Sequence, residues 1–277
     1  MTATESPPIT PAPAGARTLS QEETIRFLLE RSHRRNRTVP IRREFVQMAT
    51  PGGPAPGALQ SLVRRSQARA LDLYLLVSAV TSAGDFSVTE WSTTWARSVG
   101  LFDEKSGTVG VSRAWKVLRD LKLINRSRGK EGKSVITKLH EDGSGTLYTP
   151  PGGRGEKYFQ LPFEYWDEGL HESLSLPAKA MLLIASSLRK EKFDLPQERL
   201  PGWYGISADT AGRGLKELQD RAVLAHVDDE WFPTLSTRSG YASKPIYELL
   251  PPFHLRGMGT ALPESTADSP AGNPSAP

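Results

Sequence analysis

A run of basic side chains between positions 113 and 139 carries the densest chemistry in the sequence. The stretch RAWKVLRDLKLINRSRGKEGKSVITKL holds nine Lys and Arg residues against two acidic residues. Guanidinium and ammonium groups at this density attract anions, and a chain of phosphates is an anion that several of them can contact together. The alternative is that the basic side chains form a solvated surface with no ligand, and charge alone does not separate the two interpretations.

Residue types that support catalysis or metal binding do not fall into working arrangements. The chain has no Cys, which excludes zinc–thiolate sites and cysteine nucleophiles. Its five His residues lack metal-site spacing, and no Gly-x-Ser-x-Gly elbow occurs. GKEGKS at 129–134 is not a phosphate-binding loop, because Ser127 stands where that motif needs its first glycine. We therefore expect no enzymatic activity, no cofactor and no metal.

Charge is divided unevenly along the 277 residues, which are enough for two ordinary domains. Residues 1–150 hold 22 Lys/Arg and 14 Asp/Glu, whereas residues 151–277 hold 13 and 17. This asymmetry indicates a polyanionic partner for the first half. No apolar run approaches the roughly 20 residues that span a bilayer, and the N-terminus lacks the apolar core of a secretory signal. We expect a cytoplasmic protein with no membrane partner.

A helix followed by a hairpin is predicted to present the basic run. Val111, Trp115 and Leu118 repeat at helical spacing and predict a helix over residues 109–122. Glycines and charge at 127–133 are typical of a hairpin tip, and residues 134–139 alternate like a return strand. Upstream, residues 66–82 predict a buried helix, residues 86–88 an extended piece, and Thr89 the cap of a second helix.

The order of these elements is that of a winged helix, and VSRAWKVLRDLKLI closely resembles the recognition helices of bacterial winged helix-turn-helix regulators. The resemblance implies that small and polar residues on the helix front read base edges in the major groove, while the remaining cations contact phosphates. The expected base-reading residues are Gly110, Ser112, Arg113 and Lys116. The expected phosphate contacts are Arg119, Arg126, Arg128, Lys130 and Lys133.

The same order recurs about 100 residues later. Ser175 and Ser207 are expected to cap an apolar helix and a second recognition-type helix, in which Thr210 and Arg213 would read bases and a wing with Arg238 and Lys244 would follow. Residues 158–251 are similar to plasmid and phage replication initiators and related winged-helix regulators. A protein–protein or dimer contact is the alternative for this second unit, because Asp209 would repel phosphate.

An arginine-rich segment precedes the first unit. Residues 31–69 hold nine Arg and one acid, and they either follow a phosphate backbone or form a solvated linker. The candidate contacts in this basic arm are Arg34, Arg35, Arg37, Arg42 and Arg43. The six Trp residues mostly fall at core spacing and are expected to pack inside the protein.

Together these features predict a mostly helical α+β fold with two tandem winged-helix domains, at residues 61–150 and 151–254. Residues 19–60 are expected to form a helix and the basic arm, and residues 1–18 and 255–277 disordered tails. The resemblance implies a sequence-specific binder of double-stranded DNA in the bacterial cytoplasm, associated with the nucleoid and capable of self-association. Its role would be transcriptional regulation, or alternatively replication initiation on a plasmid or other mobile element. The alternative hypothesis, from a different functional class, is a non-enzymatic adaptor whose winged helices bind other proteins.

Overall fold

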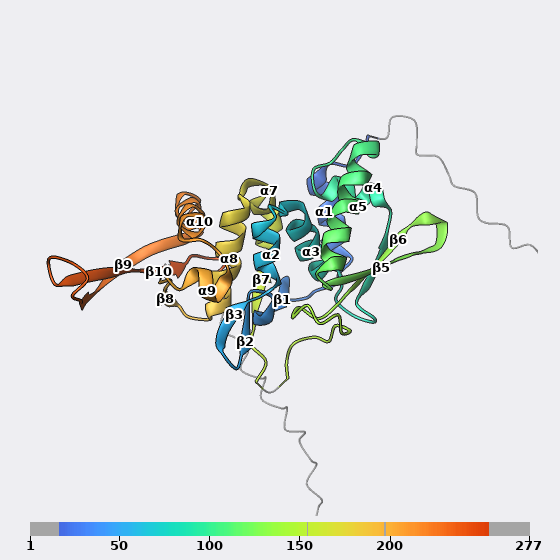
Figure 1. The fold of residues 1–277 in the computed structure, drawn as a ribbon. Helices are drawn as coiled ribbons and strands as arrows, with labels where there is room; N and C mark the ends of the chain where they lie inside the picture. The colour runs from blue at the N-terminus through green and yellow to red at the C-terminus, as the bar shows by residue number, and fades with distance from the viewer. Residues whose placement is uncertain (1–16, 154, 197, 255–277) are drawn as a thin grey trace, which may run out of the picture.

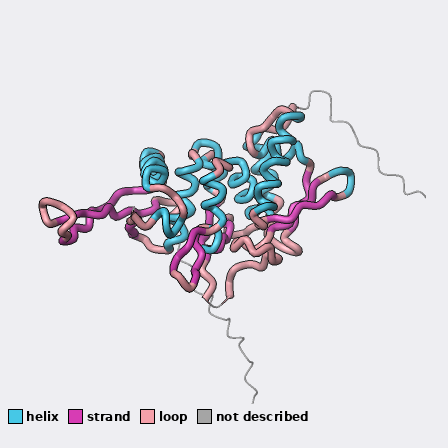
Figure 2. Tube along the Cα trace, in the orientation of Figure 1, coloured by secondary structure: helices cyan, strands magenta, loops and turns pink. Residues whose placement is uncertain are grey.

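The protein is a mixed α and β fold in which the helices occupy the centre and small antiparallel sheets lie mostly around them (Figures 1 and 2). The structure is a computed structural model that describes residues 17–153, 155–196 and 198–254. The predicted disordered tails are residues 1–18 and 255–277, of which residues 1–16 and 255–277 lie outside the described residues. Within the described residues no helix is long and apolar enough to cross a membrane.

The first half contains a helix, two small pairs of strands and a helix–hairpin unit. In chain order its elements are α1 (Gln21–Glu30), β1 (Thr38–Arg42), the 3-10 helix η1 (Arg43–Phe45), β2 (Gln47–Thr50), β3 (Gly53–Pro56), α2 (Ala58–Arg64), α3 (Ala68–Val80), β4 (Ser87–Glu90), α4 (Ser92–Ser98), α5 (Glu104–Asp120), β5 (Ile124–Arg128), the 3-10 helix η2 (Lys130–Gly132) and β6 (Ser134–Lys138). Ser20 caps α1 with Glu23 in a reciprocal capping box.

The unit that carries the basic run is α3, β4, α4, α5, β5 and β6. Its strands form one sheet in the order β4-β6-β5, with β6 in the centre. Thr89 does not cap a helix: it lies in β4 opposite Val135, so α4 begins only at Ser92. The helix α5 begins at Glu104, five residues earlier than predicted, because the Asp103 side chain accepts a hydrogen bond from the Lys105 N–H and caps it.

The second half repeats this order. Its elements are β7 (Tyr158–Pro162), α6 (Glu164–Asp167), α7 (Leu170–Ser173), α8 (Leu176–Leu188), β8 (Lys192–Asp194), α9 (Leu200–Tyr204), α10 (Ala208–Asp220), β9 (Leu224–Pro233) and β10 (Tyr241–Leu249). The sheet order β8-β10-β9 matches that of the first unit. Ser175 and Ser207 cap α8 and α10, as predicted. The β9–β10 hairpin is longer than the β5–β6 hairpin, and Asp228, Asp229 and Glu230 lie within β9.

The two halves are joined by paired strands and a shared core. The strand β1 pairs antiparallel with β7, and Val39 lies opposite Leu161. Buried residues of both halves form one cluster that extends from α1 to β10. Trp95 and Trp115 meet edge to face in this core at 5.4 Å between ring centroids. Most of the tryptophans pack in this core as predicted, and two, Trp91 and Trp231, are exposed.

Candidate nucleic-acid interface

The helix α5 is held in place by its apolar back. Val111, Ala114, Trp115 and Leu118 are buried, and they recur every three to four residues along one side of the helix. The close packing also depends on Gly107, since a Cβ there would lie 2.9 Å from the carbonyl oxygen of Leu101. This anchoring leaves the opposite face of the helix in solvent.

The exposed face of α5 carries three of the predicted base-reading residues. Ser112, Arg113 and Lys116 are exposed, and so is Arg119. Lys116 forms an ion pair with Asp120 at 2.7 Å, and its hydrogen bond holds the pKa of the Asp120 carboxyl below the ordinary value. Arg113 and Arg119 have no hydrogen bond or ion pair to any described residue. Their guanidinium groups are therefore available to a ligand.

Gly110 lies at the side of α5 and not on its front. A Cβ at this position would lie 2.9 Å from the Cδ1 atom of Leu101, so the residue faces the loop that precedes the helix. Its lack of a side chain serves the packing of that loop, which is a structural reason for the glycine that spacing alone did not reveal.

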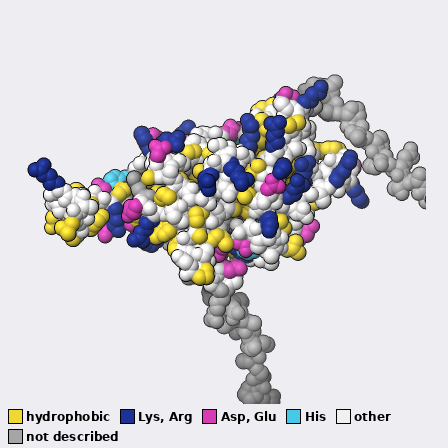
Figure 3. Space-filling model, viewed as in Figure 1, with side chains coloured by type: hydrophobic (Ala, Val, Ile, Leu, Met, Phe, Trp, Pro, Cys, Tyr) yellow, Lys and Arg dark blue, Asp and Glu magenta, His cyan; other side chains and the backbone are white. Residues whose placement is uncertain are grey.

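The β5–β6 hairpin adds a second group of cations, of which two are free. Arg128 and Lys130 are exposed and have no ionic partner among the described residues. Arg126 is half-buried and donates to the Ser134 hydroxyl at 3.0 Å. Lys133 pairs with Glu131 at 2.9 Å and lies over the Trp91 ring. Figure 3 shows Lys and Arg side chains gathered on one face over α5 and this hairpin.

The corresponding helix of the second unit, α10, has its predicted base-reading residues in a different electrostatic setting. Arg213 pairs with Asp209 at 3.1 Å, and Lys216 pairs with Asp220 at 2.9 Å. Thr210 is half-buried, and its N–H is bound by the Ser207 cap. The cations of this face are thus neutralised by acids on the same helix, so α10 attracts phosphate less than α5 does.

Glycine and glutamate residues on α10 serve its contact with α8. A Cβ at Gly214 would lie 2.5 Å from the carbonyl oxygen of Pro177, so only glycine permits this approach of the two helices. The Glu217 carboxylate accepts a hydrogen bond from the Ser175 N–H at 2.7 Å. Gly212, by contrast, faces open space.

The two predicted wing cations of the second unit differ in availability. Lys244 lies between Glu230, at 3.1 Å, and Asp194, at 3.3 Å. Hydrogen bonds to these two carboxylates, first Glu230 and then Asp194, raise the pKa of Lys244. Arg238 is exposed in the turn between β9 and β10. Lys244 is therefore committed to an internal ion pair, whereas Arg238 is free of one among the described residues.

The segment predicted as a basic arm is part of the folded protein, and four of its five candidate arginines already have protein partners, which corrects that expectation. Arg34 donates to the carbonyls of Ser78, Ala79 and Thr81 and closes the end of α3. Arg42 is buried in β1. The other three residues are Arg35, which is exposed; Arg37, which pairs with Asp167 at 2.6 Å; and Arg43, which donates to Gln47.

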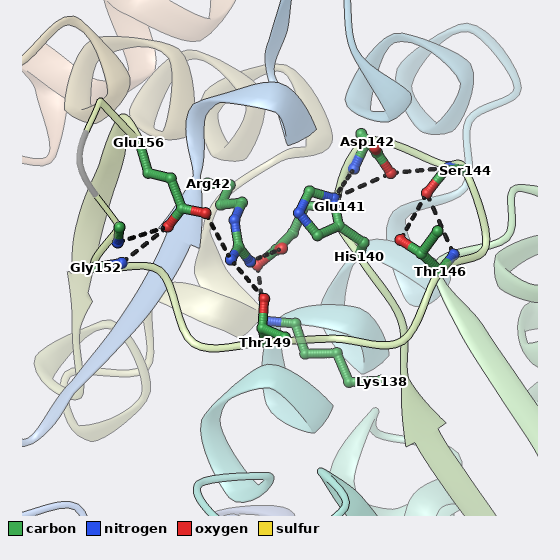
Figure 4. Close-up of polar contacts among 11 residues, drawn as sticks. Arg42, Lys138, His140, Glu141, Asp142, Ser144, Thr146, Thr149, Gly152 and Glu156 are labelled. Carbon is green, nitrogen blue, oxygen red and sulfur yellow. Dashed lines mark hydrogen bonds and ion pairs between the residues drawn. The ribbon is translucent and has the colours of Figure 1, made fainter.

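A buried charge cluster, which sequence reasoning missed, fixes the loop between the two units (Figure 4). The Glu141 carboxylate accepts from Arg42 and from Lys138, each at 2.9 Å, and all three side chains are buried. Burial lowers the pKa of Lys138, and the nearby Glu141 opposes that shift. The alternation of inward and outward side chains along a strand gave one sign of this cluster, because Ser134, Ile136 and Lys138 share the inward side of β6. The partner Arg42 is 99 positions from Glu141, which local patterns cannot reveal.

Two further features of the described residues bear on chemistry: their possible metal ligands and a cavity. No group of three or more His, Asp and Glu residues among them could hold a metal ion. A cavity of about 780 Å³ lies between the β1–β7 pair, the end of α8 and the end of β10. Its lining mixes Arg189 and Lys190 with Glu191 and Glu248, so it presents no dominant charge to a ligand.

No model of a known protein family, no curated protein and no solved structure matches this chain.

Proposed function

We propose that the chain binds double-stranded DNA sequence-specifically, without chemistry of its own, through α5 and the β5–β6 hairpin. The observation that carries the proposal is the pairing of an exposed, cationic helix with a cationic hairpin on one face (Figure 3). The strand order β4-β6-β5 around α3, α4 and α5 supports a winged helix, in which the third helix enters the major groove.

Within this proposal the residues divide by reach and charge. Arg113, near the middle of α5, can donate two parallel hydrogen bonds to guanine, and Ser112 and Lys116 lie beside it. Arg119, Arg128 and Lys130 have guanidinium or ammonium groups that suit phosphates. Arg126 and Lys133 contribute less to binding, because Ser134 and Glu131 already hold them.

The second unit supports a tandem winged-helix arrangement with one DNA-facing helix. The order of α8, β8, α9, α10, β9 and β10 repeats that of the first unit, yet the cations of α10 are internally paired. We therefore place DNA contact on the first unit and give the second unit a structural or protein-binding role.

Transcriptional regulation in a bacterial cytoplasm is the role we propose for this binding. Replication initiation is the second candidate, favoured by one observation: the β1–β7 pair and the continuous core hold two repeated units in a fixed relation. Footprinting separates the two roles. A promoter palindrome is expected of a regulator, and direct repeats with nearby melting are expected of an initiator.

Selection of bound duplexes from a random pool tests the proposal itself. The full chain is expected to enrich a defined motif, and its affinity for that motif should fall with rising salt. If Arg119, Arg128 and Lys130 each neutralise one phosphate, the log–log slope is about −3. Enrichment of no motif together with salt-independent binding would contradict DNA recognition and favour the protein-interaction adaptor.

A further inference from the structure

The β9–β10 hairpin extends well beyond the sheet that holds it. The short strand β8 pairs only with residues 246–248 of β10, so the outer part of the hairpin is a two-stranded ribbon. The side chains of β9 from His226 to Pro233 are exposed. This ribbon projects from the end of the molecule opposite to α5 and the β5–β6 hairpin (Figure 1).

The tip of this ribbon is apolar apart from the exposed Arg238. Trp231 is 68% exposed and Leu235 is fully exposed, and Phe232 and Tyr241 stand beside them in the same turn region. Figure 3 shows the hydrophobic side chains as a patch at that end of the molecule. Large apolar side chains gathered at an exposed tip lose contact with water when they dock, which marks the tip as a contact surface.

The charge behind the tip selects the kind of partner. Asp228, Asp229 and Glu230 follow one another along β9, and Lys244, which would offset them, is already held by Glu230 and Asp194. A DNA backbone would be repelled by this acidic stretch, whereas a surface that combines apolar and cationic side chains would be attracted.

Such a surface is present at the other end of the same chain. Phe102 is 59% exposed just before α5, and Val109 is 49% exposed in its second turn. Arg113 and Lys116 follow Val109 at spacings of four and seven residues, so the three side chains lie along one face of the helix. The α5 face therefore offers an apolar start followed by cations, which complements the tip in both respects.

We propose that the β9–β10 tip of one copy of the chain docks on the α5 face of a second copy. Trp231 and Leu235 would lie against Phe102 and Val109, and the acids of β9 would face Arg113 and Lys116. Because the two surfaces lie at opposite ends of one molecule, a chain cannot make this contact with itself (Figure 1).

The contact is head-to-tail, since the two docking surfaces differ. A tip-to-tip contact would instead bring two acidic ribbons together. The association stands without DNA, but one consequence rests on the proposed function: docking covers α5, so duplex DNA and a second copy compete for the same face. The free protein would in this way occupy its own DNA-binding surface.

Sedimentation velocity of the full chain tests the proposal. The average sedimentation coefficient is expected to rise with protein concentration and to fall when salt is added. A tip variant, Trp231→Ser with Leu235→Ser, and a face variant, Val109→Glu with Arg113→Glu, should each associate about tenfold or more weakly. The matched control is Leu147→Ser, which removes a side chain that is 77% exposed in the loop between the units and should leave association intact.

Mixing the two variants distinguishes head-to-tail from tip-to-tip contact. The tip variant retains the α5 face and the face variant retains the tip, so the mixture should form one-to-one dimers and nothing larger. A mixture that stays monomeric, a wild-type chain that stays monomeric at every concentration, or a tip variant that associates normally would overturn the proposal.

Addition of a random-sequence duplex completes the test. Dissociation of the assembly as DNA binds would support competition for α5, whereas an assembly that binds one duplex per chain without dissociating would overturn docking on that face. Association without any DNA binding would uphold the self-contact and contradict the proposed function.

Discussion

Arg42 and Glu141 meet inside the protein, with the arginine Nη1 atom 2.9 Å from the Glu141 Oε2 atom and with both side chains withdrawn from solvent. Arg42 belongs to β1, the strand that pairs with the start of the second half, and Glu141 belongs to the loop that leaves β6. This ion pair ties the loop between the units to the strand that joins them. The ion pair therefore adds to the strand pairing and the shared core that join the two units.

Removing the shared anion of this cluster should be costly. Glu141→Gln leaves Lys138 buried without its carboxylate and Arg42 with only the more distant Glu156, at 3.5 Å. We expect a loss of about 3–5 kcal/mol in the free energy of unfolding. Lys138→Met keeps the Arg42–Glu141 pair and should cost less. Denaturant unfolding of both variants measures the difference, and an equal or smaller loss for Glu141→Gln would contradict the assignment of Glu141 as the shared partner.

Tyr148 makes the stability of the protein sensitive to alkaline pH. Burial, followed by the nearby Glu141 charge, raises its pKa above the ordinary value. Below about pH 10 the Tyr148 phenol is protonated in the folded and the unfolded chain, and the stability of the fold is fully present. As the pH rises further only the unfolded chain ionises, so the free energy of unfolding falls. Tyr148→Phe should reduce the loss of stability above pH 10 by up to about 1.4 kcal/mol per pH unit. Unfolding curves between pH 9 and 11 test this, and parallel pH profiles would contradict it.

Alanine substitutions at two glycines of α10 should change the stability of the protein in opposite directions. Gly214→Ala places a methyl group against the Pro177 carbonyl and should destabilise the protein by about 1–3 kcal/mol. Gly212→Ala meets open space in the same helix and should stabilise it by up to about 1 kcal/mol. Thermal or denaturant unfolding measures both, and effects of the same sign would refute the packing role of Gly214.

Equivalent lysines of the two units test which unit contacts DNA. Lys116 and Lys216 each pair with an aspartate four residues later, but Lys116 has Arg113 and Arg119 beside it without partners. Lys116→Ala should weaken binding to the selected duplex, whereas Lys216→Ala should leave it unchanged. Anisotropy titrations of both variants give the comparison. An equal loss for the two would place DNA on both units.

Lys130 is expected to act on the backbone alone. Lys130→Ala should weaken binding evenly across different duplexes and make the log–log salt slope shallower by about 0.9. Titrations over a series of salt concentrations check this expectation. A change in base preference would show that the hairpin tip reads sequence.

Local signals predicted the elements well, and long-range contacts account for the errors. Ser20, Ser175 and Ser207 cap their helices because a cap depends on the neighbouring few residues. Thr89 has the chemistry of a cap as well, but pairing with Val135 holds it in a strand. Sequence periodicity could not anticipate that competition, because the partner lies 46 positions away.

The candidate site was predicted only in part, because local spacing reveals its exposed helix face but not the distant partners of its arginines. The outward face of α5 follows from its helical spacing, and Ser112, Arg113 and Lys116 are exposed as expected. Arg34 and Arg42 have the same residue type as a DNA-binding arm, yet their partners are carbonyls of α3 and the distant Glu141. Charge counts along a sequence do not distinguish an arginine that is free from one that is already bound.

The base preference of Arg113→Ala is the most direct measurement of the central claim that α5 reads DNA. The wild-type chain and the variant would be titrated against the selected duplex and against every single-base-pair change in it. The account predicts that the variant loses about 1–3 kcal/mol of discrimination at one base pair and retains the preferences at the others. A uniform loss across all duplexes, or no change at any position, would contradict it.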